Sequence, residues 1–282
     1  MLQLGLIGYP VGHSLSPWIH NRLLAQSGLE GEYQLLEIKP ENFHQEIQKL
    51  KKSSLNGFNI TIPYKEKILP YLDETDEAAN HLGAVNTVKV ENGRWIGYNT
   101  DGIGYVHSIK NRFPDLSFPD TRVLILGSGG AARGIFFALA DAGCLKIDLA
   151  NRTVDKAAAL IEELNLKVKS SALNLEDAAL QLANYDFVVQ TTSVGMNPDT
   201  DAQIISLDNL KENVIVSDIV YRPMETQFLL EAERKKARLH FGHEMLWQQA
   251  VYSFQVWTNK KLETSQMMQE FEDKLKGVHH AD

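Results

Sequence analysis

The sequence contains a single cysteine, Cys144, among its 282 residues. One thiol can form no internal disulfide and no cysteine cluster, so we expect neither a disulfide scaffold nor a cysteine-ligated metal site, and we assign no metal ligands. No stretch approaches the roughly 20 consecutive apolar residues of a membrane-spanning helix. The N-terminal segment "MLQLGLIGYP" lacks a basic region followed by a long apolar run, so we do not expect it to be a signal peptide.

Positive charge is also in deficit. The chain has 28 basic against 36 acidic residues and a formal net charge of −8, which weighs against nucleic acid or an anionic membrane as the main partner. A hydrophobic content of 44% is typical of a globular protein with a real core. We therefore expect a cytoplasmic protein with no nucleic acid and no membrane as partner. Composition does not set the oligomeric state, for which a homodimer is the expectation.

Strand and helix patterns alternate along the first hundred residues. Ser16 as N-cap, Pro17 at the first helical position and Gly28 as the stop signal predict a helix. Asn92 and Gly93 predict the turn of a hairpin. Strands are predicted over residues 2–8, 32–38 and 57–63, helices over 16–28, 40–53 and 102–112, and the hairpin over 84–99.

The segment "GFNITIPYK", residues 57–65, carries polar side chains at regular intervals. Every second residue from Phe58 is apolar, and Asn59 and Thr61 lie between them. This alternation predicts a strand that buries one row of side chains and displays the other. Pro63 is expected to end the strand, and Lys65 follows at once.

A proline-punctuated joint, "FPDLSFPD", precedes a more regular second half. "RVLILG" is wholly apolar, as in a strand buried on both faces of a parallel sheet, and the strands "KIDLAN", "DFVVQT" and "VIVSDIV" follow with helices between. Such a run predicts βαβ units. The last part of the chain, about residues 243–261 and 264–277, is expected to be helical. The predicted class is α/β, with two domains.

The most specific local pattern is "VLILGSGGAARG". Gly127, Gly129 and Ala132 fit the G-x-G-x-x-A pattern between a strand and a helix, which is typical of dinucleotide binding. The first glycine allows a tight turn, the second lets the backbone approach a pyrophosphate, and the small alanine lets the helix pack on the strand. The helix N-terminus then offers amides to the anion.

Two residues compete to set the choice of nicotinamide cofactor. An NAD site carries an acid about 20 residues after the first glycine, and Asp148 lies 21 residues after Gly127. The strand is nevertheless expected to continue to Ala150, so that "NRT" follows at its carboxyl end. Arg152 there suits a 2′-phosphate, because a guanidinium binds phosphate bidentately. NADP is therefore the expected cofactor, with NAD through Asp148 as the alternative.

Several polar motifs occur in a fixed order: "GHSLSP", "NITIPYK", "GAVNT", "YNTDG", "GSGGAA", "NRT", "VYRPMET" and "GHEMLWQQA". Together they resemble the NADP-dependent shikimate dehydrogenase family over about residues 3–260. The resemblance implies reversible reduction of 3-dehydroshikimate to shikimate in aromatic amino-acid biosynthesis. It implies a substrate domain over residues 1–104, with 239–282 returning to it as helices. It also implies a Rossmann-type NADP domain over residues 105–238.

The resemblance also implies roles for individual residues. Lys65 and Asp101 would be the catalytic pair. The implied substrate ligands are Ser14 and Ser16 for the carboxylate, Asn59, Thr61, Asn86 and Gln249 for the ring hydroxyls, and Tyr221 as a lining residue. The implied cofactor site comprises Gly127, Gly129, Gly130, Ala131, Asn151, Arg152 and Thr153, with Gly195 and Met196 near the nicotinamide.

The chemistry of ketone reduction supports the catalytic pair. The cofactor supplies a hydride, and the protein supplies a proton from a group within hydrogen-bond reach. A lysine ammonium can polarise the oxygen and donate, and a neighbouring carboxylate such as Asp101 would orient it and favour its charged form. A polyhydroxylated substrate also needs many small hydrogen-bonding side chains, which the Ser, Asn, Thr and Gln residues of these motifs provide.

Each assignment has a structural alternative. Ser16 and Asp101 suit helix N-caps, Asn86 suits a turn, and Tyr221 suits a core position. Gln249 is chosen over Gln248 by the register of the motif, and His13 is interpreted as structural. The chain also departs from the usual family pattern at Gln190–Val194, where Asn-Ala-Thr-Pro-Leu is common, and at Arg222 before Pro223. Both departures lie near the nicotinamide end of the implied site.

Three other functions share parts of this pattern. A relative that oxidises quinate with NAD is the nearest, although such enzymes often carry threonine where this chain has Ser16. A non-catalytic NADP-binding sensor would not need Lys65 and Asp101. A folate-linked dehydrogenase of similar design would not need the serine pair.

Overall fold

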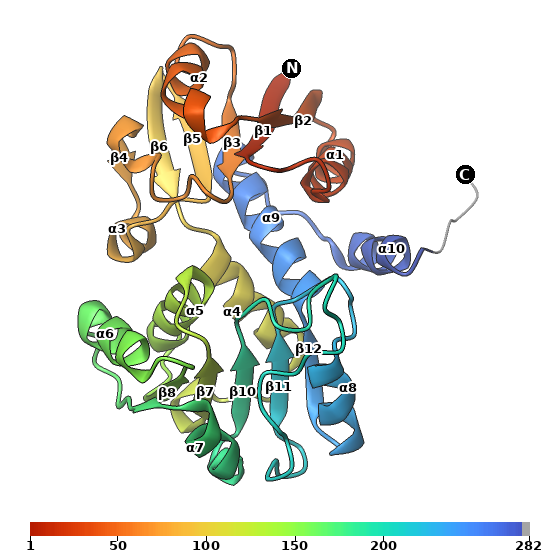
Figure 1. The fold of residues 1–282 in the computed structure, drawn as a ribbon. Coiled ribbons are helices and arrows are strands. Elements are labelled where there is room, and N and C mark those ends of the chain that lie inside the picture. Colours follow the sequence, from red (N-terminus) through yellow and green to blue (C-terminus); the bar gives the residue numbers. More distant parts are fainter. Residues whose placement is uncertain (278–282) are drawn as a thin grey trace. The chain divides into compact units, whose positions relative to one another are not determined.

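The chain divides into two compact units in the structure, a computed structural model that describes residues 1–277 (Figure 1). The first unit comprises Met1–Thr100 and the chain from Gln249 onward, and the second comprises Asp101–Gln248. Both units are α/β, and the C-terminal helical chain returns to the first, as the sequence predicts. Residues 278–282 of the predicted C-terminal segment lie outside the described residues.

The first unit contains a mixed six-stranded sheet in the order β2-β1-β3-β5-β6-β4. Its strands are β1 (Leu2–Gly8), β2 (Gly31–Glu37), β3 (Gly57–Ile60), β4 (Glu74–Thr75), β5 (Thr87–Glu91) and β6 (Arg94–Tyr98). β1 is parallel to β2 and β3, whereas β5 is antiparallel to β3 and β6. The predicted hairpin is confirmed, with Asn92 and Gly93 both at positive φ in its turn.

The helices of this unit are α1 (Ser16–Ser27), α2 (Phe43–Leu50), α3 (Glu77–Leu82), α10 (Ser265–Leu275) and the later part of α9 (Gly242–Thr258), with 3-10 turns η1 (Pro40–Asn42) and η2 (Leu69–Tyr71). α1 ends at Gly28 in the left-handed region, as predicted. The predicted N-cap Ser16 is wrong. Leu15 is the N-cap, and the Ser16 amide donates to Ser14 Oγ at 3.2 Å, so Ser14 provides the side-chain acceptor at the helix start.

The predicted half-displayed strand over residues 57–63 is also wrong. β3 ends at Ile60, and all four of its residues are buried. The reason is its position between β1 and β5, where apolar residues pack on one face and the polar face of Asn59 is covered by Ser253 of α9. Ile62, expected in the buried row, is 67% exposed.

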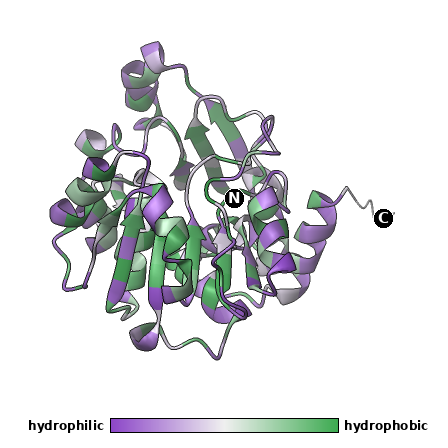
Figure 2. Ribbon diagram, turned by 60° about the horizontal axis from the view of Figure 1, so that its bottom comes forward, coloured by the Kyte–Doolittle hydropathy of each residue, from purple (hydrophilic) through white to green (hydrophobic). Residues whose placement is uncertain are grey.

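The second unit contains a six-stranded, wholly parallel sheet in the order β12-β11-β10-β7-β8-β9. Its strands are β7 (Arg122–Leu126), β8 (Lys146–Ala150), β9 (Ala172–Leu173), β10 (Phe187–Gln190), β11 (Ile215–Asp218) and β12 (Arg238–Phe241). Numbered within the unit, this is the doubly wound order 3-2-1-4-5-6. Figure 2 shows that strands are coloured mostly hydrophobic, as expected for strands with both faces covered.

Helices of the second unit lie between these strands in the sequence. They are α4 (Asp101–Arg112), α5 (Gly130–Asp141), α6 (Val154–Leu164), α7 (Leu175–Leu180), α8 (Gln227–Arg234) and the start of α9, with 3-10 turns η3 (Phe118–Asp120) and η4 (Leu182–Asn184). The predicted βαβ organisation is confirmed. Among the described residues, no helix is both long and apolar enough to cross a membrane.

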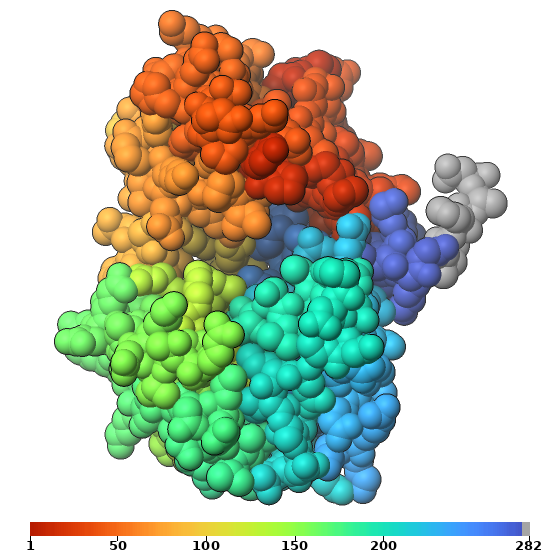
Figure 3. Space-filling model, in the orientation of Figure 1, coloured from red at the N-terminus to blue at the C-terminus, as the bar shows by residue number. Residues whose placement is uncertain are grey.

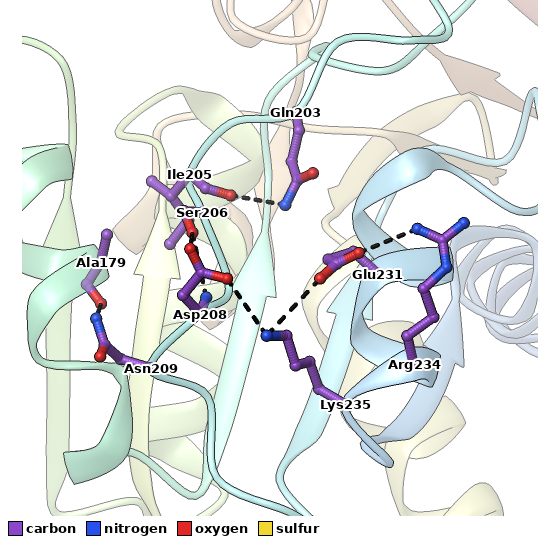
Figure 4. Close-up of polar contacts among 9 residues, drawn as sticks. All are labelled: Ala179, Gln203, Ile205, Ser206, Asp208, Asn209, Glu231, Arg234 and Lys235. Atoms are coloured by element: carbon purple, nitrogen blue, oxygen red, sulfur yellow. Dashed lines mark hydrogen bonds and ion pairs between the residues drawn. The ribbon is translucent and has the colours of Figure 1, made fainter.

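The connection from β10 to β11, residues 191–214, contains no regular helix or strand. It lies on the surface of the second unit, in the teal part of Figure 3. Lys235, directly after α8, forms an ion pair with Asp208 of this connection at 3.3 Å and with Glu231 of α8 at 4.0 Å (Figure 4). Asp208 is 80% exposed, so this ion pair contributes little to stability.

Candidate active site

The predicted substrate residues of the first unit lie at one edge of its sheet. β1 and β3 are parallel, so the segments that follow them leave the sheet at the same edge, and the Thr61 amide donates to Ile7 O at 2.9 Å. β5 runs in the opposite direction and begins there, with Asn86 directly before it. The fold therefore brings Ser14, Thr61 and Asn86 to one edge.

Ser14 and Ser16 lie together at the start of α1. Ser14 Oγ donates to Ser16 Oγ at 3.1 Å, and the Ser14 amide donates to Val11 O at 2.9 Å. Ser16 is buried and Ser14 is half-buried. The two hydroxyls are therefore adjacent, as binding of a single carboxylate by both would require.

Asn86 is held by Thr100, a residue that the sequence did not single out. The Thr100 amide donates to Asn86 Oδ1 at 2.8 Å, and Asn86 Nδ2 donates to Thr100 Oγ1 at 2.9 Å. Thr100 Oγ1 also donates to Gln249 O at 3.1 Å. The motifs "GAVNT", "YNTDG" and "GHEMLWQQA" thus meet in the first unit.

Asn59 is the centre of a buried polar network. Its Oδ1 accepts from Tyr33 Oη at 2.7 Å, and its Nδ2 is within 3.1 Å of three acceptors: Asn86 O, Thr87 Oγ1 and Ser253 Oγ. Both polar atoms of Asn59 therefore have partners inside the unit. Sequence reasoning missed Tyr33, Thr87 and Ser253. A serine on an apolar helix, four residues after Gln249, was the available signal.

Lys65 lies in the turn that follows β3, and its backbone is hydrogen-bonded to the residue before Asn86. Its carbonyl oxygen accepts from the Val85 amide at 2.8 Å, and the side chain is half-buried. Asp101 is half-buried at the first position of α4, where a helix dipole favours an acid. Lys65 belongs to the first unit and Asp101 to the second.

The predicted phosphate turn lies at the topological switch point of the second sheet. β7 lies between β8 and β10, and ligands of doubly wound sheets bind beyond the carboxyl ends of such strands. Gly127 has φ of +116°, and a Cβ there would meet Thr191 Oγ1 at 2.6 Å, so this turn requires glycine.

α5 begins immediately after this turn, at Gly130. Gly129 is its N-cap and has no capping side chain, so no side chain satisfies the first amides of the helix. A Cβ at Gly129 or Gly130 would meet no atom within 4 Å. Ala131 is the next residue, and Ala132 is fully buried. Uncapped amides beside open space fit the pyrophosphate of a dinucleotide.

Asp148, the alternative that would favour NAD, is engaged inside the sheet. It lies in the middle of β8 and is 6% exposed. Its carboxylate accepts from Arg122 Nη2 and Tyr185 Oη, both at 3.0 Å, and from the Ser171 amide at 2.8 Å. The acid is therefore a structural partner of Arg122 and is not at the end of the strand.

The segment "NRT" lies at the end of β8, as predicted. Asn151 Nδ2 donates to Thr153 O at 2.9 Å, and Thr153 is the N-cap of α6, although its side chain makes no capping hydrogen bond. Arg152 is exposed between them. An exposed arginine at this end of the second strand fits recognition of a 2′-phosphate.

The remaining predicted residues follow β10 and β11. Gly195 is buried and Met196 is 46% exposed in the loop after β10, while Tyr221 is half-buried after β11. Among residues 1–277, no group of three or more His, Cys, Asp or Glu side chains could hold a metal. Burial raises the pKa of the Cys144 thiol to about 12, which makes it a poor nucleophile.

Family models of known proteins match three parts of this chain. Residues 6–88 match the shikimate dehydrogenase substrate binding domain, residues 108–220 match the shikimate/quinate 5-dehydrogenase family, and residues 242–270 match the shikimate 5′-dehydrogenase C-terminal domain. A shikimate dehydrogenase (NADP(+)) of Oceanobacillus iheyensis is 50% identical over 98% of this chain and 99% of its own.

Two solved structures are similar throughout. A shikimate dehydrogenase in complex with NADP+ has a TM-score of 0.89 and 37% identity, covering 98% of this chain and 96% of its own. The shikimate 5-dehydrogenase of Thermus thermophilus, in complex with NADP(H) and shikimate, has a TM-score of 0.86 and 32% identity, covering 99% of this chain and all of its own.

Proposed function

Because this chain belongs to the shikimate dehydrogenase family, we propose that it catalyses the reversible NADP-dependent reduction of 3-dehydroshikimate to shikimate in aromatic amino-acid biosynthesis. The observation that carries the proposal is the 50% identity to an NADP-dependent shikimate dehydrogenase over 98% of the chain. Identity of this extent spans both units, so the whole enzyme is matched.

The first unit is the proposed substrate domain and the second is the proposed NADP domain. The sequence-based division, residues 1–104 with 239–282 and residues 105–238, remains a prediction in this functional sense. Its support is the substrate-domain match over residues 6–88, together with the glycine turn and uncapped α5 helix of the second unit. Small molecules are the proposed partners, without nucleic acid or membrane, and we propose a cytoplasmic enzyme that forms a homodimer if it assembles.

The cofactor site is proposed to consist of Gly127, Gly129, Gly130, Ala131, Asn151, Arg152, Thr153, Gly195 and Met196. The α5 amides hold the pyrophosphate, and Arg152 binds the 2′-phosphate. Gly195 and Met196 lie against the nicotinamide. When bound, NADP exchanges a hydride with the ring carbon of the substrate.

Substrate recognition is proposed for Ser14 and Ser16 at the carboxylate and for Asn59, Thr61, Asn86, Tyr221 and Gln249 around the ring. The adjacent serine hydroxyls and the anchored Asn86 amide support this assignment. Asn59 contributes least of this set to substrate binding, because its amide is already hydrogen-bonded within the unit. Its contribution is to orient Asn86 and Thr87.

Lys65 and Asp101 are proposed to handle the proton. In the reduction, the Lys65 ammonium donates a proton to the carbonyl oxygen of the substrate, and in the oxidation the neutral amine removes it. Asp101 orients the ammonium and stabilises its charge. A positioned proton donor of this kind accelerates a reaction by roughly 10²–10⁴.

The test is a matrix of initial rates with shikimate and quinate, each with NADP and NAD. We expect the highest kcat/KM for shikimate with NADP, and a large loss of kcat in Lys65→Met. A preference for quinate with NAD would overturn the substrate and cofactor assignment. NADP binding without turnover of either acid would identify a non-catalytic sensor.

A further inference from the structure

The loop after β10, residues 191–196, joins the phosphate turn to the proposed nicotinamide site. Thr191 at its start contacts Gly127, since a Cβ on that glycine would meet Thr191 Oγ1 and Thr192 Cγ2 within 2.9 Å. Met196 at its end is 46% exposed. The loop contains no regular helix or strand, so side chains must fix its shape.

Gln190 provides the first set of these contacts. It is the last residue of β10 and is 1% exposed. Its Nε2 donates to Val194 O at 3.0 Å, and its Oε1 accepts from the Thr192 amide. One amide side chain therefore bonds the backbone of the loop at two residues.

Asp218 holds Gln190 in this position from the neighbouring strand. The two residues are paired in the register of β10 with β11, and Gln190 Nε2 donates to Asp218 Oδ1 at 3.2 Å. The same oxygen accepts from the Val220 amide at 2.9 Å, and Oδ2 accepts from Thr226 Oγ1 at 2.7 Å. The carboxylate thus connects the loop after β10 with the segment that carries Tyr221.

Thr226 links Asp218 to the loop at Gly195. The threonine is fully buried and caps α8 by accepting from the Leu229 amide at 3.3 Å. Gly195 has φ of +82°, and a Cβ there would lie 3.6 Å from Thr226 Cβ. The loop is therefore fixed at both ends by one buried cluster of Gln190, Asp218 and Thr226, which we call the loop hub.

A fully buried carboxylate carries a large desolvation penalty. Asp218 is 0% exposed, and burial raises the pKa of its carboxyl to about 6, against the opposing effect of its three hydrogen-bond donors. An apolar pair at these positions would have packed without this desolvation cost. Carboxyl groups with strongly perturbed pKa values cluster at functional sites.

We propose that Gln190 and Asp218 are positioning residues that set the shape of loop 191–196 and thereby place Gly195 and Met196 against the nicotinamide ring. The inference rests on the proposed NADP site, and neither residue touches the reacting atoms. Gln190 suits this role through its length. Shortening the side chain by one methylene, about 1.5 Å, would prevent the amide from reaching Asp218 and the loop backbone together.

The experiment compares binding of NADP with binding of 2′,5′-ADP, which lacks the nicotinamide. Dissociation constants are measured by calorimetry for the wild type, Asp218→Asn and Gln190→Asn. We expect Kd for NADP to rise roughly 10- to 100-fold in both variants, and Kd for 2′,5′-ADP to change by less than about twofold. We also expect kcat to fall while KM for shikimate is retained.

Asp208→Asn is the matched control. It makes the same substitution in the β10–β11 connection, but at an exposed carboxylate whose partners are Lys235 and Ser206, as Figure 4 shows. We expect wild-type binding of both ligands.

An unchanged Kd for NADP in the folded variants would overturn the proposal. An equal rise of Kd for NADP and for 2′,5′-ADP would also overturn it, because it would indicate a general structural role. If Asp218→Asn does not fold, Gln190→Asn decides. A wild type that binds NADP but does not oxidise shikimate would refute the proposed function and leave the binding comparison valid.

Discussion

At the scale of single residues, β8 distinguishes Asp148 from Arg152, the two residues that the sequence offers as determinants of the cofactor. Asp148 is bonded to Arg122, Tyr185 and the Ser171 amide, whereas Arg152 is exposed beyond the strand. The side chain available for an adenosine phosphate is therefore the arginine. Periodicity could not decide this, because both residues lie at a plausible distance from Gly127.

Arg152→Ala should raise KM for NADP far more than KM for NAD. A bidentate charged pair contributes ~1.5–3 kcal/mol, which corresponds to roughly a 10- to 150-fold change. Steady-state kinetics with both cofactors measure the ratio. Lys156→Ala removes an equal charge from an exposed position of α6 and should leave the ratio within about twofold of wild type. Equal losses for NADP and NAD in Arg152→Ala would remove the arginine from phosphate recognition.

Lys65→Met should reduce kcat by roughly 10²–10⁴ while the Kd for shikimate changes little, because the proton donor acts in the transition state. Asp101→Asn should cause a similar loss, and the double variant should be hardly worse than the poorer single one. Lys67→Met, an exposed lysine two residues away, is the control and should retain activity. Fully additive losses would show that the two residues contribute independently.

At the scale of elements, α9 contributes a hydroxyl to the polar edge of the first sheet. Ser253 Oγ lies 2.7 Å from Thr87 Oγ1, 3.1 Å from Thr100 Oγ1 and 3.0 Å from Asn59 Nδ2, and it donates to Gln249 O. The helix thereby contacts side chains on β3 and β5 and Thr100 of "YNTDG". Thr100 in turn donates its amide to Asn86 Oδ1, so Ser253 is linked to Asn86 through Thr100.

Ser253→Ala should lower the free energy of unfolding by about 0.5–1.5 kcal/mol, because it removes the hydrogen bonds of a buried hydroxyl whose partners Asn59, Thr87 and Thr100 each keep another. KM for shikimate should rise at the same time, since Asn86 loses part of its support. Chemical denaturation and steady-state kinetics measure the two effects. Thr258→Val removes the comparable bond to Phe254 O one turn further along α9 and should leave KM unchanged. A stable variant with normal KM would show that the network does not position the ligand residues.

Elements were predictable where the signal was local. "RVLILG" followed by a glycine turn identified β7 and the start of α5, and Asn92-Gly93 identified the hairpin. β12 was not predictable, because Arg238 and His240 interrupt an apolar pattern. His240 is buried, and its ring nitrogens lie 2.8 Å from Ser108 Oγ and Ser217 Oγ. The burial of Asn59 depends on Ser253, which is 194 residues away, and no local pattern reports such a partner.

At the scale of the whole molecule, buried histidines link stability to pH. His20 is fully buried beside Tyr33 and Trp257, and neither ring nitrogen has a hydrogen-bond partner among the described residues. Burial lowers its pKa to about 3, and burial likewise lowers the pKa of His240. The unfolded chain takes up protons below about pH 6.5 that the folded chain does not, so stability falls as the pH drops from 6.5.

His20→Phe should lessen this acid sensitivity, because the ring stacking is kept and the titration is removed. Between pH 7 and pH 5, the His20 contribution to the unfolding free energy is about 2 kcal/mol. Urea midpoints at the two pH values, followed by tryptophan fluorescence, measure the difference. Asp218 acts in the opposite direction, since its raised pKa favours the folded state on acidification through pH 6, but it is common to both proteins. An identical pH dependence in variant and wild type would contradict the assignment.

The sequence predicts a set of site residues, which stays a prediction, and it does not predict the hydrogen-bond network around them. The order of the eight motifs identified the family, and the edge that gathers Ser14, Thr61 and Asn86 follows from parallel β1 and β3. Thr100, Thr87 and Ser253 were missed as network residues, because their hydrogen bonds depend on the tertiary fold and not on a local pattern. The N-cap was predicted at Ser16 but lies at Leu15, with Ser14 Oγ accepting from the Ser16 amide, and the difference depends on backbone angles.

The first unit is assembled from two pieces of chain that are far apart in the sequence. Asn59 bonds to Ser253 across 194 residues, and Trp257 Nε1 donates to Val88 O across 169. Translation delivers residues 101–248 before α9 is complete, and contacts with large sequence separation form slowly. On the ribosome, the second unit is therefore the first that can finish folding. The sheet of the first unit is synthesised earliest, but it can complete its contacts only after α9, one of the last helices, has been synthesised.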